Sequence, residues 1–239
     1  MRHLDPKSIS FDVREGEVVL LSGANGIGKS SILKAILQLE TDGKEISGEI
    51  FERSFGNILT LSRAELQKFR ASVAYVQQKD EYSEMGNIQV RDIISESGEA
   101  YSGRTMSAAE VNELTDRWIP RRSDNTRVFD AKSKPSKFSG GEQRLLSILS
   151  VLATRPQTEL LIIDEPLNNL DFVNAKSISN LINTVIRENP KMGALMISHC
   201  RIFPFITREI RLTSEGISEV EHYECHSCIG EPDENGFYR

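Results

Sequence analysis

Residues 20–30 read Leu-Leu-Ser-Gly-Ala-Asn-Gly-Ile-Gly-Lys-Ser, and this stretch decides the fold of the chain. It contains the pattern G-x-x-x-x-G-K-S, in which a glycine-rich loop joins a buried strand to a helix. Residues 18–21 are all large and apolar, as in a buried strand, and residues 32–37 carry apolar side chains at helical spacing. Because both flanks have the structure that the motif requires, the stretch favours a phosphate-binding loop over an incidental glycine-rich turn.

This loop has the chemistry that a phosphate chain needs. Glycines lack a Cβ, so several backbone N–H groups can close around one anion, and the following helix points its positive dipole end at it. Lys29 is expected to reach the β- and γ-phosphates of a nucleotide, and the Ser30 hydroxyl is expected to coordinate Mg²⁺. The residues predicted to bind the nucleotide here are Gly23, Ala24, Asn25, Gly26, Ile27, Gly28, Lys29, Ser30 and Ser31.

A second motif lies at residues 160–166, which read Leu-Leu-Ile-Ile-Asp-Glu-Pro. Four large apolar residues in a row indicate a strand that is buried on both faces. In open α/β sheets the ligand lies beyond the carboxyl ends of the strands, which is where Asp164 and Glu165 would stand. Asp164 is expected to hold Mg²⁺ beside Ser30, and Glu165 is expected to orient or deprotonate the water that attacks the γ-phosphate.

Apolar patterns along the chain alternate between strands and helices, which predicts a mostly parallel sheet covered on both faces. Alternating residues predict a half-buried first strand at 9–13, and short antiparallel strands are expected within 44–60. The further strands are expected at 73–76, 160–163, 194–197, 208–213 and 217–220, and helices at 88–96, 107–118, 141–154 and 172–188. Ser62 and Ser107 each stand three residues before a glutamate, the spacing of a helix capping box.

The expected fold class is therefore α/β, of the P-loop NTPase type, with a mostly parallel sheet, an antiparallel β edge and an inserted helical subdomain. Residues 1–79 and 138–214 are predicted to form the core of the domain. Residues 80–137 are polar and lack strong strand signals, so they are predicted to form the helical insertion, and residues 215–239 an acidic tail.

Composition limits the classes of function that the chain can have. A chain of 239 residues has room for one large domain, and no apolar run approaches the ~20 residues that span a bilayer. No hydrophobic region of a signal peptide is found at the N-terminus, so a soluble chain is expected, and any membrane role would come through a partner. Three cysteines are too few for a disulfide framework and fit a reducing compartment.

Charge is unevenly distributed along the chain. The tail at 215–239 holds seven acids and one base, which accounts for the whole net charge of −6. The remaining residues are balanced, with 28 bases and 28 acids, so no direct binding of nucleic acid is expected. Residues 121–137 contain six bases and two acids, which fits either a solvated loop or a surface for an acidic or phosphate-bearing partner.

Phe138-Ser139-Gly140-Gly141-Glu142-Gln143, 25 residues before Asp164, identifies a family. Together with the phosphate-binding loop it resembles the signature of the ATP-binding-cassette (ABC) ATPases, usually Leu-Ser-Gly-Gly-Gln. Other motifs follow the order of that family, over about residues 8–212. They are Gln78 after a strand, as in the Q-loop; Asn168-Asn169-Leu170-Asp171, similar to the D-loop; and Ile197-Ser198-His199, similar to the switch histidine.

The resemblance implies how these residues act. Two cassettes pair head to tail, so that Ser139, Gly140 and Gly141 of one copy close on ATP held by the other. The family pattern places His199 at the γ-phosphate and has Asp171 tie the two sites together. Gln78 and Lys29 join Glu165 and His199 as the implied catalytic set, and Ser30, Gln78 and Asp164 are the implied Mg²⁺ ligands. ATP and Mg²⁺ are thus the expected substrate and metal.

The sequence departs from the family pattern at two places. Before residue 9 it offers only His3 where the family has an aromatic residue that stacks on adenine, so the way in which adenine is held stays open. Cys200 follows the switch histidine, where an acidic residue is common, and no catalytic consequence is expected. The tail residues His222, Cys225, His226 and Cys228 fit either a disordered segment or a metal or redox site.

The family's commonest role favours the nucleotide-binding subunit of a transporter, in which residues 80–137 and Gln78 contact a membrane-embedded partner. Such a subunit would be cytoplasmic, on the cytoplasmic face of a membrane. The alternative is a soluble ABC ATPase that acts in DNA maintenance, translation or cofactor assembly. Against that alternative stand the lack of a long coiled-coil insertion, of a second cassette and of a basic face. A binding-only cassette is a weaker hypothesis, because Glu165 and His199 are both present.

Overall fold

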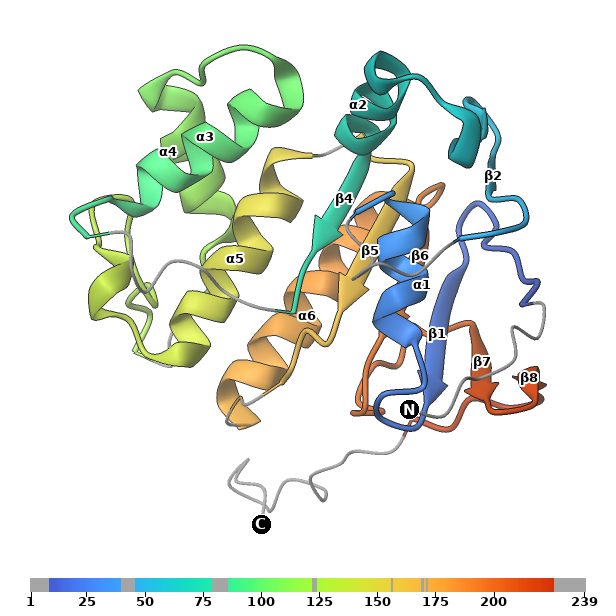
Figure 1. Cartoon of the computed structure of the whole chain (residues 1–239). Coiled ribbons are helices and arrows are strands. Elements are labelled where there is room, and N and C mark those ends of the chain that lie inside the picture. The colour runs from blue at the N-terminus through green and yellow to red at the C-terminus, as the bar shows by residue number, and fades with distance from the viewer. Residues whose placement is uncertain are drawn as a thin grey trace, which may run out of the picture.

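The computed structural model describes residues 9–39, 46–78, 86–121, 124–155, 157–168, 170 and 172–225. A six-stranded sheet runs through this part of the chain in the order β4-β5-β6-β1-β7-β8 (Figure 1). Its strands are β1 (Val18–Gly23), β4 (Val73–Val76), β5 (Leu160–Asp164), β6 (Gly193–Ile197), β7 (Arg208–Thr213) and β8 (Gly216–Val220). A separate antiparallel pair is formed by β2 (Phe51–Glu52) and β3 (Gly56–Asn57). The helices are α1 (Lys29–Ile36), α2 (Arg63–Ser72), α3 (Val90–Ser102), α4 (Ala108–Trp118), α5 (Gly140–Thr154) and α6 (Phe172–Glu188).

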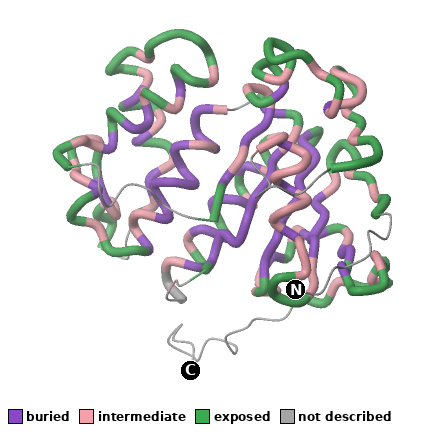
Figure 2. The backbone as a smooth tube through the Cα atoms, viewed as in Figure 1, coloured by how far each residue is buried: buried purple, intermediate pink, exposed green. Residues whose placement is uncertain are grey.

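The sheet is buried on both faces because its strands present apolar side chains alternately to two cores. In β1, Val18 and Leu20 belong to one hydrophobic cluster, while Val19 and Leu21 belong to the other. The first cluster takes in side chains from α3, α4, α5 and α6, and the second those from α1 and α2. Figure 2 shows the resulting run of buried residues through the strands and the helices against them.

The register of the parallel strands sets the place of the functional site. Leu21 of β1 and Asp164 of β5 both pair with Ile197 of β6, and Val76 of β4 pairs with Ile163. The segments that follow these four strands therefore all leave the sheet at the row of carboxyl strand ends, which forms its lower edge in Figure 1. Ligands of open α/β sheets bind at this edge.

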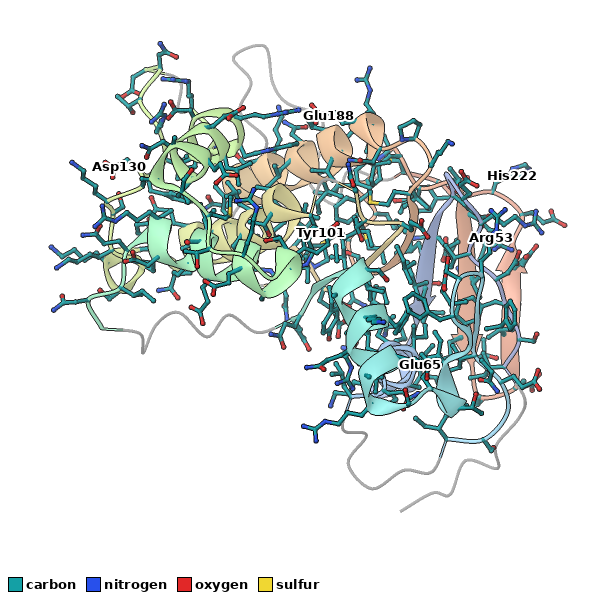
Figure 3. The ribbon with its side chains drawn as sticks, turned by 90° about the horizontal axis from the view of Figure 1, so that it is seen from above. Arg53, Glu65, Tyr101, Asp130, Glu188 and His222 are labelled. Carbon is teal, nitrogen blue, oxygen red and sulfur yellow. The ribbon has the colours of Figure 1, made fainter. Side chains whose placement is uncertain are left out.

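The helical insertion packs beside the sheet on α5. Figure 3, seen from above, places Tyr101 and Asp130 in this helical part and His222 on the side of β7 and β8.

Both predicted capping boxes are confirmed, since Ser62 and Ser107 accept from the backbone N–H of Glu65 and Glu110. Arg104 and Ser107 hold the pKa of Glu110 down at about 2.

The predicted fold class is confirmed, including the antiparallel edge formed by β7 and β8. The predicted strand at 9–13 is wrong, because none of these residues is in a strand. Phe11 and Val13 do pack on the second cluster, but the side chain of Arg208, not a strand partner, donates to the Asp12 carbonyl. The domain boundaries at 79, 137 and 214 remain predictions. In the described residues, no helix is long and apolar enough to cross a membrane.

Because the sheet is buried on both faces, truncation of its interior side chains should strongly lower the free energy of unfolding. Ile163 is fully buried, so Ile163→Ala should lower the free energy of unfolding by about 2–5 kcal/mol through lost burial and a residual cavity. Urea denaturation measures this change. Phe51→Ala is the matched control, because Phe51 is 76% exposed and its truncation should change the stability by less than about 0.5 kcal/mol. Equal losses in the two variants would contradict the assignment of the core.

Candidate functional site

The loop between β1 and α1 has the backbone that its glycines were expected to provide. Gly28 caps α1 with a φ of 112°, and Gly26 has a φ of 75°, both in the left-handed region that favours glycine. A Cβ built at either position would meet nothing within 4 Å, so the approach to the loop is open there. Gly23 serves packing instead, since a Cβ there would lie 2.5 Å from the carbonyl oxygen of Leu212 on β7.

Lys29 lies inside this loop. Its side chain is buried at 7% exposure, and its Nζ donates to the carbonyl oxygens of Gly23 at 2.8 Å and Ala24 at 3.1 Å. The ammonium group thus lies where phosphate oxygens held by the loop would meet it. Asn25 at the tip is exposed, and Ile27 donates its backbone N–H back to Ala24.

Ser30 and Asp164 meet at the end of β5, as the motifs predicted. The Ser30 hydroxyl donates to Asp164 Oδ1 at 3.3 Å. Burial raises the pKa of the Asp164 carboxyl above its usual value, although the bond from Ser30 and the charges of Arg144 and Lys29 act in the opposite direction. A hydroxyl and a desolvated carboxylate side by side are oxygen ligands that suit Mg²⁺, which is commonly held by one or two carboxylates together with phosphates. No group of three or more His, Cys, Asp or Glu side chains that could hold a metal ion occurs within the described ranges. Ser30 and Asp164 could hold the ion together with phosphate oxygens of the nucleotide.

Glu165 and His199 form the second close pair. His199 Nε2 lies 3.1 Å from Glu165 Oε1, and the backbone N–H of His199 donates to Glu165 Oε2 at 3.3 Å. The Nε2 contact lacks hydrogen-bond alignment, so among the described residues Oε1 has no hydrogen-bond donor although it is buried. Glu165 also has a φ of 47°, unusual for a non-glycine residue, and its backbone N–H donates to Ile197. The positive φ is a strained backbone conformation, and it holds a buried carboxylate beside His199, where the carboxylate could accept a proton from water.

Arg144 is a residue of this site that the sequence analysis did not identify. It comes from α5 and is only 2% exposed. Its guanidinium donates to the backbone carbonyls of Gln77 at 2.5 Å, Asp164 at 3.2 Å, Glu165 at 3.1 Å and Pro166 at 3.1 Å. The available signal was the apolar run that begins directly after Arg144, because a cation at the start of a buried helix face must find acceptors.

The signature segment begins α5, with Ser139 as its N-cap accepting from the Glu142 N–H. A Cβ on Gly140 would meet nothing within 4 Å, whereas a Cβ on Gly141 would lie 2.3 Å from Asn174 Nδ2 of α6. Gly140 is therefore free to face a ligand, and Gly141 allows α6 to approach. Figure 1 shows the start of α5 well away from the start of α1 along the lower edge of the molecule.

The structure thus brings together five residues from the start of α1 and the carboxyl ends of β5 and β6: Lys29, Ser30, Asp164, Glu165 and His199. It does not bring the signature residues to the same site. Gln78 is exposed just beyond β4 at the same edge of the sheet, and Ser31 lies in the first turn of α1. Asp171, Asn169, His226 and Cys228 lie outside the described residues.

The raised pKa of Asp164 predicts a gain in stability when its charge is removed. Above its folded pKa the buried carboxylate is ionised and opposes folding, so Asp164→Asn should raise the melting temperature at pH 7. The gain should shrink as the pH falls through the folded pKa, where Asp164 itself becomes neutral. Thermal melts of both proteins between pH 4 and pH 8 measure this. Asp116→Asn, at an exposed ion pair, is the control, and a lower melting temperature of Asp164→Asn at pH 7 would contradict the prediction.

Comparison with known proteins agrees with this geometry. Residues 6–168 match the family model described as ABC transporter. An oligopeptide transport ATP-binding protein of Streptococcus mutans is 30% identical over 245 residues, covering 95% of this chain and 75% of the relative. A lipoprotein-releasing system ATP-binding protein of Myxococcus xanthus is 27% identical, covering 89% of both. For a dipeptide transport ATP-binding protein of Lactococcus lactis the identity is 31%, covering 80% of this chain but only 59% of the relative.

Solved structures are similar in fold. A bacterial ABC transporter cassette, solved as a dimer, has a TM-score of 0.72 at 22% identity and covers 91% of both chains. The family model covers more than half of the sequence, and it matches the loop, the signature and the Asp-Glu motif alike. This chain belongs to the ABC transporter family of ATP-binding cassettes.

Proposed function

We propose that this chain hydrolyses ATP in a Mg²⁺-dependent reaction, as one of two paired cassettes that energise transport by a membrane-embedded partner. The observation that carries the proposal is the convergence of Lys29, Ser30 and Asp164 with the Glu165–His199 pair at one edge of the sheet. Phosphoryl transfer depends on positioning and charge stabilisation, and these residues supply both.

Each residue has a separate role in the proposed reaction. The loop N–H groups and Lys29 bind the β- and γ-phosphates, and Ser30 and Asp164 hold the metal, which neutralises charge on the phosphate oxygens when bound. Glu165, buried beside His199, accepts the proton of the attacking water. His199 is exposed at 51% of its side chain, so it can contact both Glu165 and the γ-phosphate. Gln78 is proposed to add a ligand or orient the water from the end of β4.

Pairing of two cassettes follows from the distance between the two anion sites of one chain. Ser139 and Gly140 offer the N-terminus of α5, a place that favours negative charge. That terminus is remote from the phosphate-binding loop of its own chain (Figure 1), so a second copy would bring its signature to this ATP. Asp171 is proposed to lie between the two sites. The solved cassette of similar fold is described as dimeric, which supports pairing itself.

Coupling to a membrane partner is supported by the names of the relatives. Three of the relatives are ATP-binding proteins of systems that transport dipeptides or oligopeptides or release lipoproteins. We extend only the shared part, ATP-driven transport, to this chain. A cassette in that role would lie at the cytoplasmic face of a membrane, where the exposed helical insertion and Gln78 would contact the partner.

Gly140→Ala and Gly141→Ala separate the binding role of the signature from its packing role. Gly140→Ala should leave the melting temperature within about 2 °C, since its Cβ has room, but should weaken ATP-dependent pairing about tenfold by crowding the partner's phosphates. Gly141→Ala should lower the melting temperature, because Asn174 must shift. Analytical ultracentrifugation with ATP and thermal melts measure the two effects. Unchanged pairing of Gly140→Ala would contradict the role of the signature.

Glu165→Gln should bind ATP but turn it over at least about 100-fold more slowly, because the amide cannot accept the proton. The closed pair should then accumulate with Mg-ATP and be absent with ADP, as measured by size-exclusion chromatography. Glu65→Gln, at the exposed capping box of α2 outside the candidate site, is the control and should turn over ATP normally. Normal turnover by Glu165→Gln would refute Glu165 as the base.

The trapped Glu165→Gln protein also tests the coupling to transport. Tagged protein with Mg-ATP is used to capture partners from detergent-solubilised membranes, and the bound proteins are identified by mass spectrometry. A polytopic membrane protein is the expected result, held with Mg-ATP and lost in a Gln78→Ala variant. Recovery of a homodimer alone, or of soluble partners, would overturn the transport role and favour a soluble ABC ATPase.

A further inference from the structure

Glu209 is a buried carboxylate that the proposed reaction does not use. It lies on β7 and is 0% exposed. Arg201 Nη2 donates to both of its oxygens, at 2.5 Å and 2.6 Å, and the Ser22 hydroxyl donates to Oε1 at 2.6 Å. Arg211 Nη2 stands farther away, at 3.6 Å from Oε1. A fully buried charge is retained only when it is paired and hydrogen-bonded, and here both donors come from segments next to the site.

These donors connect the two sides of the candidate site. Ser22 is the residue before Gly23, whose carbonyl accepts from Lys29. Arg201 lies two residues after His199, in the turn that follows β6. A chain of polar contacts therefore runs from the phosphate-binding loop through Ser22, Glu209 and Arg201 to the turn that carries His199, and from His199 to Glu165.

We propose that Arg201 and Glu209 are positioning residues that fix the turn carrying His199 against the phosphate-binding loop. Neither side chain touches the reacting atoms. One guanidinium nitrogen, Nη2, contacts both carboxylate oxygens at short range, so the contact is a charge-assisted pair that ties the segment after β6 to β7. The ring of Tyr223 covers Arg201, with the guanidinium carbon 5.7 Å from the ring centre, which limits the access of water to the pair.

This inference rests on the proposed ATP hydrolysis, and its consequence is a change in kcat without a change in nucleotide binding. If His199 is held by Arg201, loss of the guanidinium lets the imidazole move away from Glu165 while the loop and Lys29 keep their contacts. A displacement of about 1 Å at a reacting group can cost on the order of 100-fold in rate. We expect a smaller loss, about tenfold, since the backbone N–H of His199 still donates to Glu165.

The experiment compares Arg201→Met, Arg201→Lys and the double variant Arg201→Met with Glu209→Met in the full chain. Steady-state ATPase assays give kcat and KM, and thermal melts give stability. Arg208→Met is the matched control, because Arg208 is the neighbour of Glu209 on β7 and pairs with Glu17, Asp12 and Glu219 away from the site. Wild-type turnover is measured first, so a failure of the proposed ATPase activity is seen independently of these variants.

Arg201→Met should lower kcat about tenfold, keep KM within about twofold and lower the melting temperature, because Glu209 loses its partner. Arg201→Lys should recover part of kcat. The double variant should recover the melting temperature, since no unpaired charge stays buried, but not kcat. Arg208→Met should lose stability with an unchanged kcat.

A second readout does not depend on turnover. The imidazole resonances of the four histidines in the chain can be followed by NMR, with His199 assigned from a His199→Gln variant. The His199 resonance should shift in Arg201→Met and remain in place in Arg208→Met. The inference is overturned if the double variant recovers kcat together with stability, or if the His199 resonance does not respond to Arg201→Met.

Discussion

A single buried guanidinium holds the candidate site together. Arg144 of α5 donates to carbonyl groups at the ends of β4 and β5, so one side chain joins the helix that begins with the signature to the segments that carry Gln78, Asp164 and Glu165. Carbonyl groups that leave a sheet edge have no strand partner and must be satisfied in another way. Because Arg144 satisfies four of them at once, a movement of α5 relative to the sheet has to break or rebuild these bonds. The position of α5 is therefore coupled to the carboxyl ends of β4 and β5.

The residues of the candidate site, at the carboxyl ends of the strands, have features that lower the stability of the fold. Asp164 is desolvated enough to raise its pKa, Glu165 has a positive φ, and Lys29 is buried against carbonyl oxygens. Backbone strain and buried charge are each unfavourable, so they persist only where the surrounding packing determines them. The fully buried apolar residues of the two clusters supply that packing from both faces of the sheet. The rigid sheet is therefore what allows a strained, charged site to exist at its end.

The sequence was sufficient for features that depend on local pattern. The strand and turn around Gly23 to Ser30, the buried strand before Asp164 and two capping boxes follow from spacing alone, and all are found in the structure. The strand at 9–13 was predicted from alternation, which reports that Phe11 and Val13 face a core but not whether a neighbouring strand pairs with them. Pairing is a tertiary property, and here an arginine from β7 takes the carbonyl instead.

Arg144 and Glu209 could not be assigned from sequence for a related reason. Arg144 directly precedes the apolar run of α5, and Glu209 falls on the polar phase of the alternation in β7, so pattern alone does not mark either residue as buried. What each does depends on acceptors or donors that are far away in the chain, at separations of 20 to 67 residues for Arg144 and 187 residues for the bond from Ser22 to Glu209. Such partners are fixed by the order of the strands, in which β7 lies beside β1 and β5 beside β4. The motifs identify the groups that would bind and cleave the nucleotide. The strand order determines which buried charged residues hold those groups in place, and these residues can be identified only in the folded chain.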